Sequence, residues 1–147
     1  MKTKYLKRII ASYVRDKDTP YSESLTTPAE VAECFKYLRT RDREEFVSLH
    51  LDQGLRPICW DRVSVGALSM TLVHPREVFK TVLLSNASAV IFIHNHPSGR
   101  SEPSIEDKKI TQKLQEAAKL LEIQVMDHLI IAGENEGLFS FKENGLL

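Results

Sequence analysis

Two histidines and an aspartate in the middle of the chain have the types and the spacing of metal ligands. An apolar run rich in β-branched residues, 89–93, leads directly into His94 and His96. Because side chains alternate between the two faces of a strand, both imidazoles should project from the same side of it. Asp107 follows at a position from which its carboxylate can face back toward the strand end. Two imidazoles and one carboxylate, with a fourth position open to water, are typical of a catalytic zinc, whereas structural zinc sites are usually closed and rich in thiolates.

The residues between the second histidine and the aspartate predict a turn followed by a helix. Pro97 lacks the N–H that a sheet ladder requires, and Pro-Ser-Gly at 97–99 favours a turn. Ser104 is a good helix N-cap, and Asp107 three residues later has the placement of a capping box. A plain capping role for Ser104 and a helix-dipole role for Asp107 are both compatible with a place in a metal site. Glu106, one step round the helix, is the alternative carboxylate.

These residues resemble the JAMM (MPN+) metallopeptidase family, and within it the bacterial RadC-like branch. The family pattern is His-x-His-Pro, a spacer and Ser-x-x-Asp, which the chain matches at 94–97 and 104–107. The form His-Asn-His-Pro-Ser-Gly, specific to the RadC-like branch, is present unbroken at 94–99. The likeness covers about residues 27–147. It implies a JAB/MPN-like fold, similar to that of cytidine deaminases.

The resemblance also implies an activity and a ligand set. Members of the family with this motif are zinc-dependent hydrolases of peptide or isopeptide bonds, so the implied substrate is a protein or a peptide. The implied cofactor is Zn2+, held by His94, His96 and Asp107. The motif selects Asp107 over the neighbouring Glu106.

Two further residues receive catalytic roles from the resemblance. The family has a glutamate just before an aromatic residue at the start of an early strand, and Glu45 before Phe46 resembles that element. Glu45 is therefore expected to act as the general base, although the adjacent Glu44 leaves the strand register open. In the family the serine of Ser-x-x-Asp helps to stabilise the oxyanion, so Ser104 is expected to do the same.

Two other classes of function compete with hydrolysis. One is an accessory protein in DNA repair or mobile-element biology that acts by binding. Twenty basic and twenty acidic residues give zero formal net charge, so overall charge does not indicate a nucleic-acid partner. The other is a catalytically idle scaffold, which the presence of all five motif residues argues against. Other zinc signatures do not fit, because the chain has no His-Glu-x-x-His helix and its two cysteines cannot form the deaminase pattern.

Length and composition predict one catalytic domain with a short N-terminal extension. The 147 residues are 42% hydrophobic and 27% charged, as in ordinary globular proteins. Residues 1–26 are expected to be an arm and linker, and 27–147 the domain, without the helix-hairpin-helix region common in full-length RadC-like proteins. Cys34 and Cys59 are expected to be reduced core residues of a cytoplasmic protein. Neither a signal peptide nor a membrane span is predicted.

The order of predicted elements indicates an α/β fold in which helices sandwich a mixed sheet. Residues 5–15 are interpreted as either an edge strand or an arm, and Pro57 as a sign of an edge strand or a bulge. The predicted helices span 28–40, 75–85 and 104–122, and the predicted strands span 45–51, 55–60, 62–72, 89–94, 123–132 and 138–141.

The remaining histidines lack metal-ligand spacing. We interpret His50 as a packed polar group and His74 as a turn residue before Pro75. Asp127 and His128 form an ionisable pair in a strand that is otherwise apolar, and such a pair needs partners when it is buried. A structural or supporting role is predicted for both.

Overall fold

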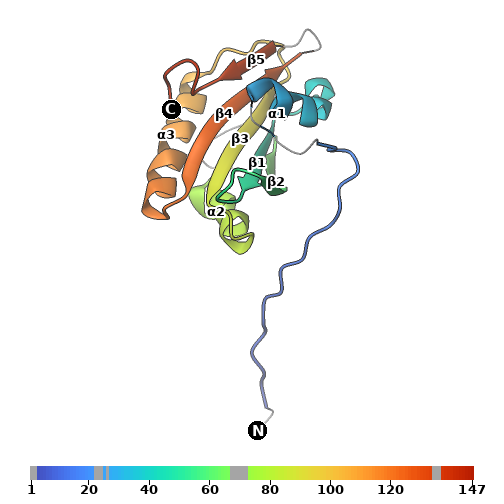
Figure 1. Cartoon of the computed structure of the whole chain (residues 1–147), viewed down its shortest axis with the longest axis vertical. Coiled ribbons are helices and arrows are strands. Elements are labelled where there is room, and N and C mark those ends of the chain that lie inside the picture. The colour runs from blue at the N-terminus through green and yellow to red at the C-terminus, as the bar shows by residue number, and fades with distance from the viewer. Residues whose placement is uncertain (1–2, 22–24, 26, 67–72, 134–136) are drawn as a thin grey trace.

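The computed structural model describes residues 3–21, 25, 27–66, 73–133 and 137–147. Within these residues the core is a five-stranded mixed sheet of order β2-β1-β3-β4-β5, flanked by helices (Figure 1). This confirms the predicted α/β class. The elements are α1 (Pro28–Cys34), the 3-10 helix η1 (Lys36–Thr40), β1 (Glu45–Leu51), β2 (Pro57–Val65), α2 (Pro75–Leu84), β3 (Ala89–His96), α3 (Ile105–Leu120), β4 (Gln124–Ala132) and β5 (Gly137–Ser140).

Both faces of the sheet are covered, which explains why nearly every residue of β1 and β3 is buried. On one face, α1 packs against odd-numbered strand residues such as Leu49 and Ile93. On the other face, α2 and α3 pack against even-numbered residues, among them Phe46 and Phe92. Every residue of β1 is buried. The alternation therefore assigns each side chain of the central strands to one of two separate cores.

The crossover between β3 and β4 brings the start of α3 to the end of β3. These two strands run parallel, whereas β1 pairs with β2 and β3, and β4 with β5, in antiparallel fashion. Parallel neighbours need a crossover connection, and α3 provides it. The helix begins directly after its N-cap Ser104, with a complete capping box formed with Asp107. Its first turn is thus held close to the strand that carries both histidines.

The structure corrects two of the predicted boundaries. The helix expected over 28–40 ends at Cys34 and continues as the 3-10 helix η1. The strands expected over 55–60 and 62–72 are one strand, β2, as far as Val65, while 67–72 lie outside the described residues. Asp61 and Arg62 lie within β2, an edge strand with partly exposed side chains, where charges are tolerated. The edge position predicted from Pro57 is confirmed.

The N-terminal segment is an arm and not an edge strand. Residues 3–15 have no regular secondary structure and extend away from the domain (Figure 1). The arm joins the domain at Asp16 and Thr19, whose side-chain oxygens lie 3.0 Å and 3.1 Å from Trp60 Nε1. None of the helices in the described part of the chain has the length and apolar character needed to cross a membrane.

Candidate metal centre

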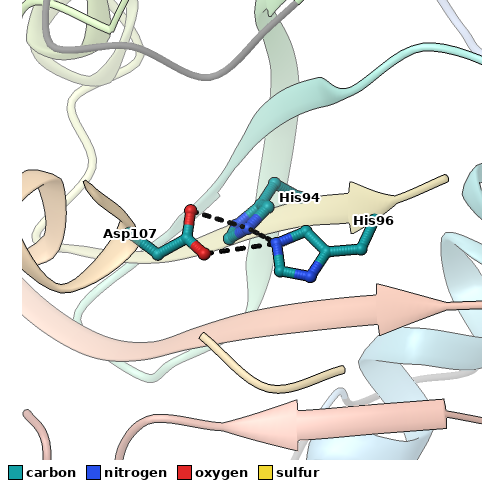
Figure 2. Close-up of side chains that lie close together, drawn as sticks. All are labelled: His94, His96 and Asp107. Atoms are coloured by element: carbon teal, nitrogen blue, oxygen red, sulfur yellow. Dashed lines mark hydrogen bonds and ion pairs between the residues drawn. The ribbon is translucent and has the colours of Figure 1, made fainter. Parts of the chain in front are cut away.

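The end of β3 and the first turn of α3 bring His94, His96 and Asp107 together, and their side chains point toward one another (Figure 2). His94 Nε2 lies 3.3 Å from Asp107 Oδ1, and His96 Nε2 lies 3.2 Å from Asp107 Oδ2. The two Nε2 atoms are 3.0 Å apart. Both histidines occupy the face of β3 that is covered by α2 and α3, as expected from strand alternation.

These distances fit a small tetrahedral cation. Zinc bonds of about 2.0 Å to nitrogen and oxygen imply tetrahedral edges of about 3.3 Å between neighbouring ligand atoms. The two Nε2 atoms are 3.0 Å apart, and each lies 3.2 or 3.3 Å from a different oxygen of Asp107, so each of these three pairs is close to that edge length. Two imidazole nitrogens and one carboxylate are also a donor set that zinc accepts. His94, His96 and Asp107 can therefore form a metal site.

The cluster is closed on one side and open on the other. The side chains of His94 and Asp107 are 0% and 2% exposed, whereas that of His96 is 11% exposed. His96 Nδ1 donates to the carbonyl oxygen of Arg100 at 2.8 Å, so the turn after β3 orients this imidazole. Solvent therefore reaches the cluster from the His96 side.

Charges within the cluster compensate one another. Burial favours a raised pKa for the Asp107 carboxyl, but the adjacent imidazoles of His94 and His96 and the backbone N–H of Ser104 outweigh it and hold that pKa well below its usual range. Burial lowers the pKa of His94. For His96, burial acts in the same direction, but the hydrogen bond to Asp107 outweighs it and raises the pKa. The carboxylate is thus anionic, and a cation at this position competes with a proton on His96.

The structure places the side chain of Glu45, the residue expected to act as general base, away from this cluster. Its side chain lies on the α1 face of the sheet, where Oε1 is 3.3 Å from Arg41 Nε and Oε2 is 2.9 Å from Arg62 Nε. Phe46, the next residue, stacks on His94 on the opposite face. Because strand side chains alternate, a shift of one residue moves a side chain to the other face.

Glu44 is the glutamate on the histidine side. It precedes Glu45 by one residue and so shares the face of Phe46, which pairs with His94 across β1 and β3. Its carbonyl oxygen accepts from Gly66 N–H at 2.8 Å, so the strand pairing extends to this residue. Burial is the largest influence on the pKa of His94 and lowers it, while the nearby charge of Glu44 acts to raise it.

Asn95, between the two histidines, fixes the backbone on either side of Glu44. Its side chain points to the opposite face from the imidazoles, where Oδ1 accepts from Glu45 N–H at 2.7 Å. Its Nδ2 donates to the carbonyl oxygen of Arg43 at 2.9 Å. The side chain of Asn95 is thereby clamped across residues 43–45. This contact was not predicted, since nothing in the local sequence links positions so far apart.

Ser104 occupies the predicted N-cap of α3. Its Oγ accepts from Asp107 N–H at 3.1 Å, and its own N–H donates to Asp107 Oδ2 at 2.7 Å. The capping role is confirmed. Because the cap uses a lone pair of Oγ, the hydroxyl proton remains for another acceptor. The same backbone contact orients the carboxylate that faces His96, so the cap and the cluster are coupled.

His128 contacts the cluster directly, which fits the structural or supporting role predicted for it. This residue of β4 is fully buried, and its Nε2 lies 2.8 Å from His94 Nδ1. Burial is the main reason why the pKa of His128 lies well below its usual value. The neighbouring Asp127 faces the other way, accepting from Ser140 Oγ at 2.5 Å and from Lys142 N–H at 3.0 Å. The signal in the sequence was the ionisable pair Asp127-His128 in an otherwise apolar strand.

The fold and the site together define an α/β domain of the JAB type. The sheet is mixed, and a His-His-Asp cluster lies between the end of a central strand and the start of the helix that crosses over from it. The model of the RadC-like JAB domain family matches residues 25–146, and the chain belongs to that family. The family expected from the motif is confirmed.

Curated relatives are bacterial proteins of the UPF0758 group. The chain is 39% identical over 145 residues to one from Pelodictyon phaeoclathratiforme, covering 95% of this chain and 64% of that protein. It is 48% identical over 126 residues to one from Trichlorobacter lovleyi, covering 85% and 54%. It is 50% identical over 106 residues to UPF0758 protein YfjY of Escherichia coli K12, covering 72% and 65%. The chain thus spans about half to two thirds of the length of these relatives, whose names state no activity.

Proposed function

We propose that this domain is a zinc-dependent metallopeptidase that hydrolyses a peptide or isopeptide bond. The observation that supports the proposal best is the convergence of His94 Nε2, His96 Nε2 and the Asp107 carboxylate at separations of 3.0 to 3.3 Å, with solvent access beside His96. Bound zinc would polarise a carbonyl and lower the pKa of a coordinated water from about 15.7 to about 7. The substrate would be a protein or a peptide, met in the cytoplasm, where the free thiols Cys34 and Cys59 stay reduced.

Glu44, and not Glu45, is our proposed general base. Its charge acts on both histidines of the cluster, whereas both oxygens of Glu45 are engaged by arginines on the other face of the sheet. Glu44 would accept a proton from the attacking water and deliver it to the departing amine. A base contributes only if it can reach the reacting atoms. Because the arginines hold Glu45 on the other face of the sheet, we select Glu44.

Ser104 is our proposed donor to the developing oxyanion. Its hydroxyl stands at the N-terminus of α3, next to the carboxylate of Asp107 that completes the ligand set. The positive end of the helix dipole favours negative charge at the same place. A well-placed donor of this kind contributes about 3 kcal/mol to transition-state stabilisation.

Metal content and chelator sensitivity test the proposal. The purified protein is expected to hold zinc at a one-to-one ratio, measured by elemental analysis, and to cleave either a fluorogenic peptide library or lysine-linked isopeptides. A chelator should abolish cleavage, and added zinc should restore it. His96→Ala should lose tight zinc binding and keep its fold, because the residue lies at a strand end. Retained stoichiometric zinc in this variant would contradict the ligand assignment.

A further inference from the structure

A continuous chain of buried hydrogen bonds connects the backbone of α3 with His94. Thr111 Oγ1 lies 2.7 Å from the carbonyl oxygen of Asp107 and 2.6 Å from His128 Nδ1. His128 Nε2 lies 2.8 Å from His94 Nδ1. The residues in this chain are at most 2% exposed. It therefore joins two of the proposed metal ligands through two residues that do not themselves face the metal position.

Elementary chemistry fixes the direction of each bond. A carbonyl oxygen only accepts, so the Thr111 hydroxyl donates its proton to Asp107, and Oγ1 must accept from His128 Nδ1–H. His128 is packed against the rings of Phe92 and Phe141 without exposure, a setting that disfavours a charged imidazole. Its Nε2 is then an unprotonated acceptor.

The consequence for His94 is a single tautomer. Because His128 Nε2 accepts, the proton between the two rings belongs to His94 Nδ1. The other nitrogen of His94, Nε2, is left with an unshared lone pair that points at His96 and Asp107. His96 donates Nδ1–H to the backbone carbonyl of Arg100, which leaves its Nε2 as the nitrogen that faces the cluster. Only the tautomer of His94 depends on side chains that a substitution can remove.

We propose that His128 is a positioning residue that holds His94 in the tautomer and orientation required for metal ligation, and that Thr111 in turn orients His128. This inference rests on the proposed function, since it takes His94 Nε2 as a ligand atom. A proton on His94 Nε2 would block ligation. The hydrogen-bond chain therefore favours the tautomer of His94 that can bind a metal before any metal is present. Such outer partners of metal-bound histidines typically contribute about 10- to 100-fold in metal affinity.

Zinc affinity of folded His128 variants tests the proposal. His128→Phe keeps an aromatic ring against Phe141 but removes both nitrogens, and it is expected to bind zinc about 10- to 100-fold more weakly in a chelator competition assay. His128→Gln offers an amide oxygen to His94 and an N–H to Thr111, and should recover most of the affinity. If His128→Phe does not fold, Thr111→Val carries the test, and it should weaken zinc binding because it leaves His128 Nδ1–H without its acceptor.

His50→Phe is the matched control. His50 is as deeply buried as His128 and is hydrogen-bonded to two hydroxyls, at 2.8 Å to Ser48 and 2.9 Å to Ser85. It makes no hydrogen bond to the cluster in the described residues. Its replacement should lower the stability of the protein and leave zinc affinity of the folded protein unchanged. This contrast separates loss of a buried histidine from loss of the His94 contact.

A readout without metal separates this proposal from the proposed function. Two-dimensional 15N NMR of the metal-free protein should show the His94 side chain with its proton on Nδ1, and His128→Phe should shift it toward the Nε2 form. That switch in a protein that binds no zinc would uphold the positioning role and overturn the metallopeptidase. Tight zinc binding by wild type, with equal affinity and an unchanged His94 tautomer in His128→Phe, would overturn the positioning role alone.

Discussion

At the scale of single residues, a step of one position along the chain decides which glutamate can take part in chemistry. Glu45 is 5% exposed and is bound to two arginines on the α1 face, so it stabilises the junction of η1, β1 and β2. Glu44 lies close enough for its charge to act on both histidines. Glu45 thus has a structural role, whereas the neighbouring Glu44 has a proposed catalytic role.

Substitution of each glutamate by glutamine tests this division. Glu44→Gln should keep zinc and fold but lower kcat by about 100- to 10,000-fold, because the amide cannot carry the proton. Glu45→Gln should retain turnover and lose about 1 to 3 kcal/mol of unfolding free energy, since two arginines lose a charged partner. Steady-state kinetics and urea denaturation on both variants distinguish the roles. Loss of turnover in Glu45→Gln alone would reverse the assignment.

Ser104 has two proposed roles, and its replacement separates them. As an N-cap, Ser104→Ala should cost about 1 kcal/mol of stability. As an oxyanion donor, the same change should lower kcat by about 100-fold or more with little change in zinc affinity. Thr27→Ala is the control, because Thr27 forms the same capping box at the start of α1. A Ser104→Ala protein that is less stable but fully active would remove this residue from the catalytic set.

At the scale of elements, the segment from β3 to α3 was predictable because its determinants are local. Strand alternation places His94 and His96 on one face, a proline ends the ladder, and a serine caps the helix that carries Asp107. Each of these rules acts within a few residues. The three proposed metal ligands could therefore be located before any tertiary contact was known.

The parts that could not be predicted depend on contacts between distant elements. The register of the start of β1 is set by Asn95, whose side chain binds the backbone of Arg43 and Glu45 from the neighbouring strand. The role of His128 arises from the parallel pairing of β4 with β3. Local patterns contain no information about either contact, and two consecutive glutamates gave no preference for one face.

His50 joins β1 to the end of α2 and makes this contact sensitive to pH. Its ring hydrogen-bonds Ser48 and Ser85, and burial lowers the pKa of His50 to about 4, against a charge from Asp61 that raises it. The unfolded chain, with a pKa near 6.5, binds the proton more readily. The stabilising effect is complete above about pH 6.5 and is lost as the pH falls toward 4.

The size of this effect can be measured by denaturation at two pH values. Between pH 7 and pH 5, titration of His50 alone should remove about 2 kcal/mol of unfolding free energy. His50→Gln does not titrate in this range, so the variant should lose less stability than wild type over the same interval. Equal pH dependence in the two proteins would show that His50 is not buried in its neutral form.

At the scale of the whole molecule, the N-terminal arm differs from the domain in that its side chains are largely exposed. The apolar side chains of the arm are exposed, among them Tyr5, Leu6 and Ile9. Deletion of the chain up to residue 15 should therefore change unfolding free energy by no more than about 0.5 kcal/mol and leave zinc affinity unchanged.

A longer deletion provides the comparison. Removal of the chain up to residue 20 also takes away Asp16 and Thr19, which hydrogen-bond Trp60 Nε1. It should cost about 1 kcal/mol more than the shorter deletion, because the partly buried indole N–H loses its acceptors. Urea midpoints of the two truncated proteins give the difference. A large loss in the shorter deletion would mean that the arm packs on the domain in solution.

The three proposed metal ligands lie within the single segment 94–107, whereas β1 and β3 must meet across the intervening α2. The entropy of closing a loop rises with its length, so this short segment can converge before the sheet is complete. A cation that binds so early stabilises the transition state of folding as well as the native state. Zinc would then act on the rate at which the chain refolds, and the finished domain would be reached sooner in its presence.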